Sequence, residues 1–324
     1  MKIVQKMVFI FLALGTFLMA SQDDLATMYR SGHFKTILQE LDKRLGEKGY
    51  WNGVLSDYDT TYGWYENDKY LLMCNDQEIK LYEQVKKQLK YIQSAQAVFG
   101  RVEGDKQIEG DLKTPVGIYR LTEKKDHVDP FYGPLAFVTS YPNLYDRTLK
   151  KNGNGIWLHG YPMGCDEKDN TKGCIAVNND DLINLSKNID HTKTLLISNC
   201  KDRPINANKE TLAELMAFIY RWRAAWKENR FDDYIESYAD DFVRYDGKKL
   251  NAFKAMKKNV FAIARQKEID FSDFTVTPYP NSLGKVLWRV TFHEDYRASN
   301  YKFQGLKELY IQEKRGYFRI VVEQ

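Results

Sequence analysis

The sequence predicts an α+β protein of three parts: a short helical N-terminal segment, a mostly-β central domain, and a C-terminal domain in which helices precede strands. Three observations lead to this prediction. Apolar residues recur at helical spacing over 24–46, short strand-forming runs dominate 69–198, and a long amphipathic helix over 210–227 is followed by strands up to residue 322. A chain of 324 residues also exceeds what one hydrophobic core usually organises.

Residues 1–20 have the composition of a secretory signal peptide. Lys2 and Lys6 precede an apolar run from Met7 to Met19, and the small residue Ala20 follows it. The run is shorter than the ~20 residues that span a membrane comfortably. We therefore expect cleavage after Ala20 and export, with an uncleaved anchor as the alternative. No later segment is apolar for long enough to predict an integral membrane domain.

Residues 21–67 form the helical N-terminal segment. Its apolar pattern breaks near Ser31-Gly32, which predicts two short helices. From Tyr50 to Tyr65 the chain has aromatic residues, Gly and Asp without a regular period, which predicts a loop packed on a neighbouring surface. The rings of this loop either form an interface, for instance that of a homodimer, or pack within the chain against the central domain; they are Trp51, Tyr58, Tyr62 and Trp64.

Composition excludes several classes of function. The net charge of +4 is small and the basic residues are dispersed among acidic ones, so we expect no nucleic-acid binding. No histidine pair has metal-ligand spacing and no Cys-x-x-Cys occurs, so we expect no metal and no cofactor. The run Asn152-Gly153-Asn154-Gly155 lacks the Lys-Ser/Thr of a phosphate-binding loop and predicts a turn.

The central domain, residues 68–202, contains a succession of short strands. Asn75-Asp76 has turn chemistry between the first two of them. A short helix is expected to start at Asp180, capped by Asn179 or Asp180. The predicted strands cover Lys69–Cys74, Glu78–Glu83, Tyr91–Phe99, Gly117–Leu121, Leu135–Ser140, Gly155–Leu158 and Thr194–Ser198.

Cys174 and His159 are the candidate catalytic pair. Cys174 follows Gly173 in the run Thr171-Lys172-Gly173-Cys174-Ile175, fifteen residues after His159, which ends a predicted strand. A thiol with a pKa near ~8.5 needs a neighbouring base or oriented N–H groups to act as a nucleophile at neutral pH. His159 is the candidate base, and Gly173 lets the backbone N–H groups of Gly173 and Cys174 approach an oxyanion.

The other three cysteines cannot be assigned by spacing. Two disulfides could form among four cysteines in an exported chain, but a nucleophilic Cys174 must stay reduced. Cys165 is close enough in sequence to Cys174 to exchange with it. Cys74, Cys165 and Cys200 are otherwise expected to be unpaired thiols.

These residues resemble the YkuD-type L,D-transpeptidase family, whose signature is His-Gly, a variable loop, and Ser/Thr-x-Gly-Cys. Here these positions are His159-Gly160 and Thr171–Cys174, and Thr114-Pro115-Val116-Gly117-Ile118-Tyr119 resembles the family's Thr-Pro-x-Gly-x-Tyr strand entry. The resemblance implies a β-sandwich-like fold and action on peptidoglycan tetrapeptide stems. It also implies that Cys174 forms a thioester, His159 moves protons, the Gly160 carbonyl holds the imidazole, and the Gly173 and Cys174 N–H groups bind the oxyanion.

Four residues near the two motifs are candidates for substrate binding. Stem peptides are anionic, so cationic side chains near the cleft should position them. Lys113, Arg147 and Lys172 lie close in sequence to the motifs, and Trp157 lies on the His159 strand.

The C-terminal domain, residues 205–324, resembles the NTF2-like (SnoaL-like) α+β cone. The resemblance lies in a Trp-x-x-x-Trp helix and the Tyr238-Ala239-Asp240-Asp241-Phe242 segment, followed by a helix near 253–266 and four strands. We expect this domain to bind or orient substrate without doing chemistry. Its aromatic residues are either walls of a pocket or core; they are Trp222, Trp226, Tyr234, Tyr238, Phe242 and Trp288.

The order of the three parts resembles the cell-shape L,D-carboxypeptidases of helical Gram-negative bacteria, which implies a periplasmic enzyme that removes the terminal D-Ala. Many L,D-transpeptidases carry Arg two residues after the cysteine and His just before the Gly-Cys, where this chain has Ala176 and Lys172. An L,D-transpeptidase that forms 3-3 crosslinks or attaches a protein to peptidoglycan is the first alternative. A non-catalytic cell-wall binding or scaffolding protein is the second.

Overall fold

The computed structural model describes residues 24–75, 77–164, 171–199, 207–263, 266–299 and 301–324. The predicted signal peptide, Cys165 and Cys200 lie outside these ranges. None of the helices in them has the length and apolar composition needed to cross a membrane.

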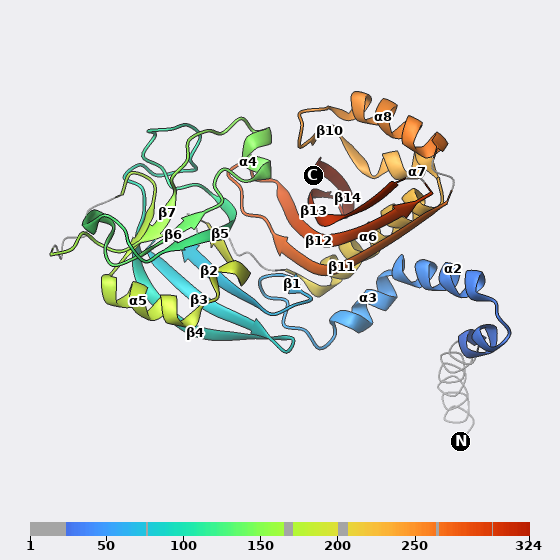
Figure 1. The fold of residues 1–324 in the computed structure, drawn as a ribbon, viewed down its shortest axis with the longest axis horizontal. Helices are drawn as coiled ribbons and strands as arrows, with labels where there is room; N and C mark the ends of the chain where they lie inside the picture. Colours follow the sequence, from blue (N-terminus) through green and yellow to red (C-terminus); the bar gives the residue numbers. More distant parts are fainter. Residues whose placement is uncertain (1–23, 76, 165–170, 200–206, 264–265, 300) are drawn as a thin grey trace, which may run out of the picture.

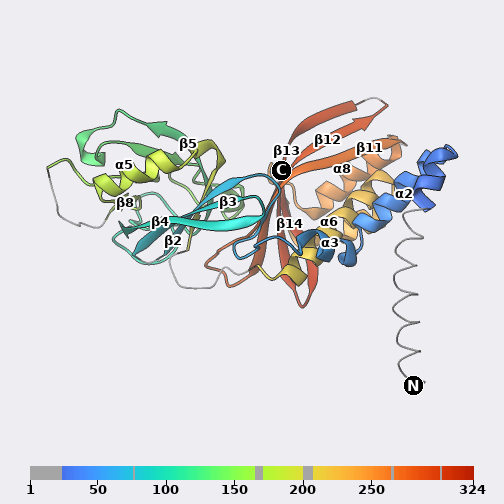
Figure 2. The ribbon, with the colours of Figure 1, turned by 90° about the horizontal axis from the view of Figure 1, so that it is seen from below.

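Two β-rich lobes lie side by side, and the N-terminal helices pack against α6 (Lys209–Lys227) of the C-terminal one (Figure 1). Residues 24–30 are helical, and α2 (Phe34–Leu45) follows after the predicted break at Ser31-Gly32. Figure 2 shows α2 and α3 (Lys48–Leu55) lying beside α6 (Lys209–Lys227) of the C-terminal lobe.

The predicted loop from Tyr50 to Tyr65 is wrong at both ends, since this stretch contains α3 and β1 (Trp64–Tyr65). Burial explains the helix: Trp51 and Leu55 are 4% and 0% exposed and belong to the C-terminal core. The ring of Trp51 packs against Trp64 at 5.7 Å and Tyr220 at 5.3 Å. Trp51, Trp64 and Tyr58 therefore pack within the chain on the C-terminal core. Tyr62 packs against Tyr82 of the central domain, with ring centroids 5.1 Å apart.

The central domain is a closed barrel of eight described strands in the order β2-β3-β4-β8-β7-β6-β5-β9. The expected β-sandwich is corrected to a barrel because β9 pairs with both β2 and β5, and β8 joins β4 to β7, so no edge stays open. Its elements are β2 (Lys69–Asn75), β3 (Glu78–Val85), β4 (Gln88–Val98), β5 (Gly117–Lys125), η1 (Pro130–Tyr132), β6 (Ala136–Thr139), α4 (Leu144–Thr148), β7 (Trp157–His159), β8 (Ile175–Val177), α5 (Asn179–Asn188), η2 (His191–Lys193) and β9 (Thr194–Ser198).

The helix after the cysteine begins one residue earlier than predicted. Asn178 is its N-cap, and its side chain accepts a hydrogen bond from the Asp180 N–H, so neither Asn179 nor Asp180 is the cap. Leu182 and Leu185 of α5 are buried in the barrel core. The helix thus fixes the end of β8, and with it the segment that carries Cys174.

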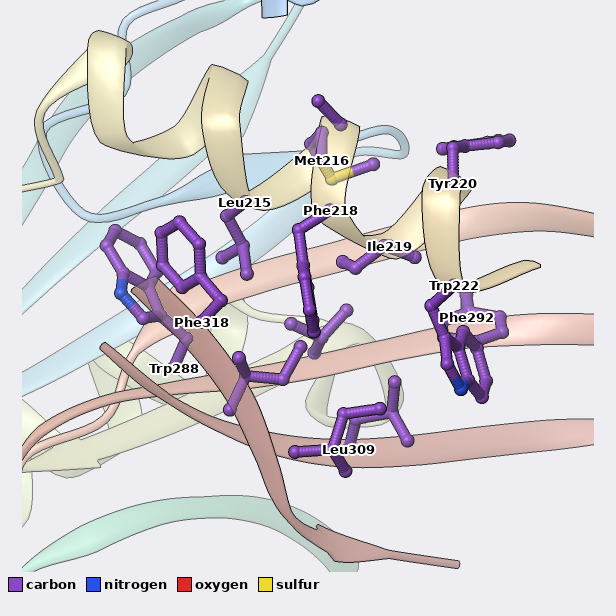
Figure 3. Close-up of a cluster of buried hydrophobic side chains, with 14 of the residues drawn as sticks. Leu215, Met216, Phe218, Ile219, Tyr220, Trp222, Trp288, Phe292, Leu309 and Phe318 are labelled. Carbon is purple, nitrogen blue, oxygen red and sulfur yellow. The ribbon is translucent and has the colours of Figure 1, made fainter. Parts of the chain in front are cut away.

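The C-terminal domain is a strongly curved sheet covered by helices, in the order β1-β11-β12-β13-β14-β10. The amphipathic pattern predicted over 210–227 is α6, which begins at Lys209. Figure 3 shows Leu215, Ile219 and Trp222 of this helix directed toward the strands that carry Phe292 and Leu309. The remaining elements are α7 (Phe231–Glu236), β10 (Tyr238–Arg244), α8 (Leu250–Ile263), β11 (Lys267–Pro278), β12 (Val286–Ala298), β13 (Tyr301–Lys314) and β14 (Tyr317–Glu323).

A shared apolar core joins the two domains. Leu71, Met73 and Ile118 of the barrel belong to the same buried cluster as Tyr279 and Tyr310 of the C-terminal sheet. The short strand β1 also pairs with β11, so the segment that precedes the barrel completes the C-terminal sheet. Separating the domains would expose this apolar surface to water, which makes their relative placement part of the fold.

Candidate active site

The site lies on the outer face of the barrel, where β7 and β8 run parallel. Leu158 pairs with Ile175, and both are buried in the barrel core. Since side chains alternate along a strand, the neighbours of this pair face outward together. His159, which pairs with Ala176, therefore shares a face with Cys174, which directly precedes β8. The register places the Cα atoms of His159 and Cys174 roughly 8 Å apart, from the usual strand spacing and rise.

Backbone groups hold the Cys174 thiol. The Trp157 N–H donates to Sγ at 3.5 Å, and Sγ lies 3.4 Å from the Gly155 carbonyl oxygen, to which the thiol can donate. Burial raises the pKa of the Cys174 thiol above its usual value, while the Trp157 N–H and the charge of Lys106 oppose that rise. The thiol therefore needs a base to become a nucleophile at neutral pH.

His159 is fixed in one orientation by the next residue. Its Nδ1 lies 2.6 Å from the Gly160 carbonyl oxygen. A carbonyl can only accept, so Nδ1 carries the proton and Nε2 of the neutral ring is available as a base. The side chain is buried, and burial lowers the pKa of His159 below its usual 6.5. The imidazole is therefore neutral at physiological pH, as a general base must be.

Gly173 requires glycine for two reasons. Its φ is +128°, a backbone conformation that L side chains rarely adopt. An added Cβ would also lie 2.7 Å from the carbonyl oxygen of Lys113. The Gly173 N–H donates to Thr171 Oγ1 at 3.0 Å, and Thr171 Oγ1 in turn donates to the Cys174 carbonyl at 2.6 Å. The hydroxyl thus ties together the loop that carries the thiol.

The structure brings together three of the four predicted substrate-binding residues. Trp157 holds the thiol through its N–H, Lys172 is exposed next to Gly173, and the backbone of Lys113 packs on Gly173. Arg147 is placed differently: it lies on α4, its Nη1 donates to the Pro142 carbonyl at 2.7 Å, and this helix contacts β14 of the C-terminal domain.

Sequence reasoning missed Tyr132 and Lys106. The ring of Tyr132 lies edge-on to the His159 imidazole at 5.1 Å and against Trp157 at 4.9 Å, and its carbonyl accepts from the Gly160 N–H at 3.0 Å. It comes from η1, 27 residues before His159, and no motif marks it. Lys106 is 3% exposed and lies near enough to act on the thiol. In the sequence, Lys106 is marked only by its position eight residues before Thr114 of the Thr-Pro motif.

A cavity of about 870 Å³ lies in the C-terminal domain, away from Cys174. Lys307 donates to Glu323 within it and lies 3.9 Å from Glu294. Burial lowers the pKa of Lys257 to about 8, and its ammonium lies 4.7 Å from the centre of the Trp226 ring. Of the six aromatic residues considered as pocket walls, Trp226 lines this cavity, and all six are buried members of the core. No group of three potential metal ligands occurs among the residues described.

Family comparisons agree with the two-domain architecture. Residues 69–197 match the L,D-transpeptidase catalytic domain (YkuD), and residues 214–324 match the Cds6 C-terminal NTF2-like domain. The fold and the site thus define an enzyme of the L,D-transpeptidase class. The chain belongs to the YkuD-type family whose members carry an NTF2-like C-terminal domain, which confirms the resemblance inferred from the motifs.

Solved structures give the same result. A mutant of the helical cell shape determining protein Pgp2 from Campylobacter jejuni is 35% identical, with a TM-score of 0.82 over 87% of this chain and 99% of that chain. A second structure of Pgp2 is 35% identical, with a TM-score of 0.81 over 86% and 100%. Bd1075 of Bdellovibrio bacteriovorus, at 24% identity and a TM-score of 0.63 over 79% and 91%, shares the fold. A comparison with curated proteins gave no match.

Proposed function

We propose that the chain is a peptidoglycan L,D-carboxypeptidase that removes the terminal D-Ala from tetrapeptide stems through a thioester at Cys174. The observation that carries this proposal is the pairing of β7 with β8, which puts a partly buried thiol on the same face as an imidazole fixed by the Gly160 carbonyl. The YkuD match supports peptidoglycan as the substrate.

The reaction follows from this arrangement in two halves. His159 Nε2 takes the thiol proton as Cys174 Sγ attacks the carbonyl of the third stem residue, and it returns that proton to the amine of the departing D-Ala. Water then attacks the thioester while His159 accepts its proton. The thiolate leaves, recovers the proton from the imidazolium, and a tripeptide carboxylate is released.

Two backbone N–H groups are proposed to stabilise the oxyanion, those of Gly173 and Cys174. In the structure the Gly173 N–H donates to Thr171 Oγ1. It must therefore exchange that hydroxyl for the oxyanion when substrate binds, and the developing negative charge is the stronger acceptor.

Hydrolysis is favoured over transfer to a second stem by Ala176. This residue pairs with His159 in register and is 3% exposed, so it offers no cation at the place where many L,D-transpeptidases carry arginine. The candidate cations nearer the thiol are Lys172 and Lys113. Similarity to Pgp2, described as a helical cell shape determining protein, supports a role in cell shape, and the predicted signal peptide supports action in the periplasm.

The C-terminal domain is proposed to bind or orient substrate without chemistry of its own. Its cavity combines aromatic walls with buried charges, and a stem peptide has complementary apolar and charged groups. A chain that ended near Lys201 would expose the shared apolar core, so removal of the domain is a poor test of this role.

The test is incubation of the purified full chain with disaccharide tetrapeptide, followed by mass spectrometry. Loss of one alanine with addition of water supports the carboxypeptidase. A crosslinked dimer would identify a transpeptidase instead, and unchanged substrate would favour a binding or scaffolding protein.

A further inference from the structure

The C-terminal domain reaches into the polar interior of the catalytic domain through residues 279–282. Ser282 Oγ donates to Asp105 Oδ2 at 2.8 Å, and Tyr279 Oη accepts from Asn143 Nδ2 at 2.8 Å. An added Cβ at Gly117, in the Thr-Pro-x-Gly motif, would lie 2.6 Å from Tyr279 Oη. The glycine of that motif therefore leaves room for a side chain of the other domain.

Asp105 is part of a buried ion network. Lys151 Nζ donates to Asp105 at 2.9 and 2.7 Å and lies 3.0 Å from Asp146 Oδ1. The Val116 N–H donates to Asp105 Oδ1 at 2.9 Å. Asp105 is 8% exposed and Asp146 is 0% exposed, so each of these contacts replaces a lost water contact. Ser282 supplies a further donor to this carboxylate, from the C-terminal domain.

The segment that starts at Asp105 packs beside the loop that precedes Gly155. Lys106 Nζ donates to Asp111 Oδ1 at 2.8 Å and to the Ile108 carbonyl at 3.1 Å. Lys106 also packs against Gly153, where its Cε would lie 3.4 Å from an added Cβ. Gly153 is two residues before Gly155, whose carbonyl contacts the Cys174 thiol. The Lys106 charge favours the thiolate, in opposition to burial.

The other end of the same segment touches the loop that carries the nucleophile. Asp111 accepts from the Lys113 N–H at 3.2 Å, and the Lys113 carbonyl packs against Gly173. Residues 105–113 are thus held at Asp105 from the C-terminal domain and contact Gly153 and Gly173, in the two loops that flank the thiol.

We propose that Ser282 and Tyr279 are positioning residues for Cys174, which hold residues 105–113 in place so that docking of the C-terminal domain sets the reactivity of the thiol. The proposal rests on the proposed function only in taking Cys174 as the nucleophile. Neither side chain touches substrate. Ser282 acts through Asp105 directly. Tyr279 acts through Asn143, whose N–H donates to Asp146 Oδ2 at 3.1 Å and so joins the same buried network.

The test compares Ser282→Ala and Tyr279→Phe with Ser272→Ala, an exposed serine on β11 of the same domain. Carbamidomethylation of Cys174 in the full chain is followed by peptide mass spectrometry from pH 6 to 10, without substrate. A hydrogen bond to a charged acceptor is lost in Ser282→Ala, so we expect the rate at pH 7.5 to fall about three- to tenfold and its pH midpoint to rise. Tyr279→Phe should act in the same direction, and Ser272→Ala should match the wild type.

Turnover of disaccharide tetrapeptide adds a second readout. The positioning role predicts a lower kcat with little change in KM, since the substrate contacts stay intact. A lower Tm with an unchanged alkylation profile in both variants would overturn the proposal, because the contacts would then serve stability alone. Failure of the proposed function would appear separately, as a wild-type chain that alkylates at Cys174 but releases no D-Ala.

Discussion

Gly173→Ala tests whether the backbone at the nucleophile is as constrained as the structure shows. The substitution forces an L side chain to φ +128° and places its Cβ 2.7 Å from the Lys113 carbonyl oxygen. Strain of that kind costs about 1–3 kcal/mol, and overpacking against backbone adds about 1–3 kcal/mol. Together these terms predict a cost of about 4 kcal/mol to the native conformation. Part of it should appear as a lower free energy of unfolding, and the rest should be relieved by displacement of the loop that carries Cys174.

The assay is thermal unfolding together with alkylation of Cys174, and Gly316→Ala, in the turn between β13 and β14, is the matched control. Gly316 also has a positive φ, +79°, but nothing lies within 4 Å of an added Cβ there. Its replacement should cost only the left-handed strain of about 1–2 kcal/mol. Gly173→Ala should therefore lower Tm by about twice as much or more, and alter the alkylation rate, which Gly316→Ala should leave unchanged. Equal effects of the two substitutions on both measurements would refute the reasoning.

Three further predictions concern pH, substrate and stability. Burial lowers the pKa of His159, so the acid limb of kcat/KM should have its midpoint below 6.5, and a midpoint above 7 would show that the imidazole is not the buried base described. Lys172→Ala should raise KM more than it lowers kcat. Arg147→Ala should change KM less, because the Arg147 guanidinium is bound to the Pro142 carbonyl. Equal changes of KM in the two variants, measured by steady-state kinetics, would contradict this placement. Glu323→Gln removes the buried partner of Lys307 and should lower the free energy of unfolding by about 3–5 kcal/mol, while the exposed Glu268→Gln should have almost no effect in denaturant titration.

Local pattern was enough to predict the long elements. The spacing of apolar residues over 210–227 matches α6 within a residue, because one face of that helix is buried along its whole length. The thiol and the imidazole were also predictable, since both lie in one short stretch of sequence beside glycines. The family resemblance of the central domain followed from the same motifs, and that of the C-terminal domain followed from its long helix and the segment 238–242.

Elements that depend on distant contacts could not be predicted. α3 contains Gly49 and Gly53, which disfavour a helix, and it forms because Trp51 and Leu55 pack on the C-terminal core. β8 has three residues, too few to show a period, and closure of the barrel depends on β9 pairing with β2 over a separation of more than 100 residues. Tyr132 reaches His159 only through that tertiary arrangement.

The central claim is that Cys174 carries the stem peptide and water releases it. The direct measurement is mass spectrometry of disaccharide tetrapeptide incubated in H₂¹⁸O with the wild type and with Cys174→Ala. We predict that the wild type releases D-Ala and yields tripeptide with one ¹⁸O atom in its new carboxylate, and that Cys174→Ala yields no product while keeping the wild-type fold by circular dichroism. Release of D-Ala by Cys174→Ala at a rate near that of the wild type would contradict the account, and so would a crosslinked product that carries no ¹⁸O.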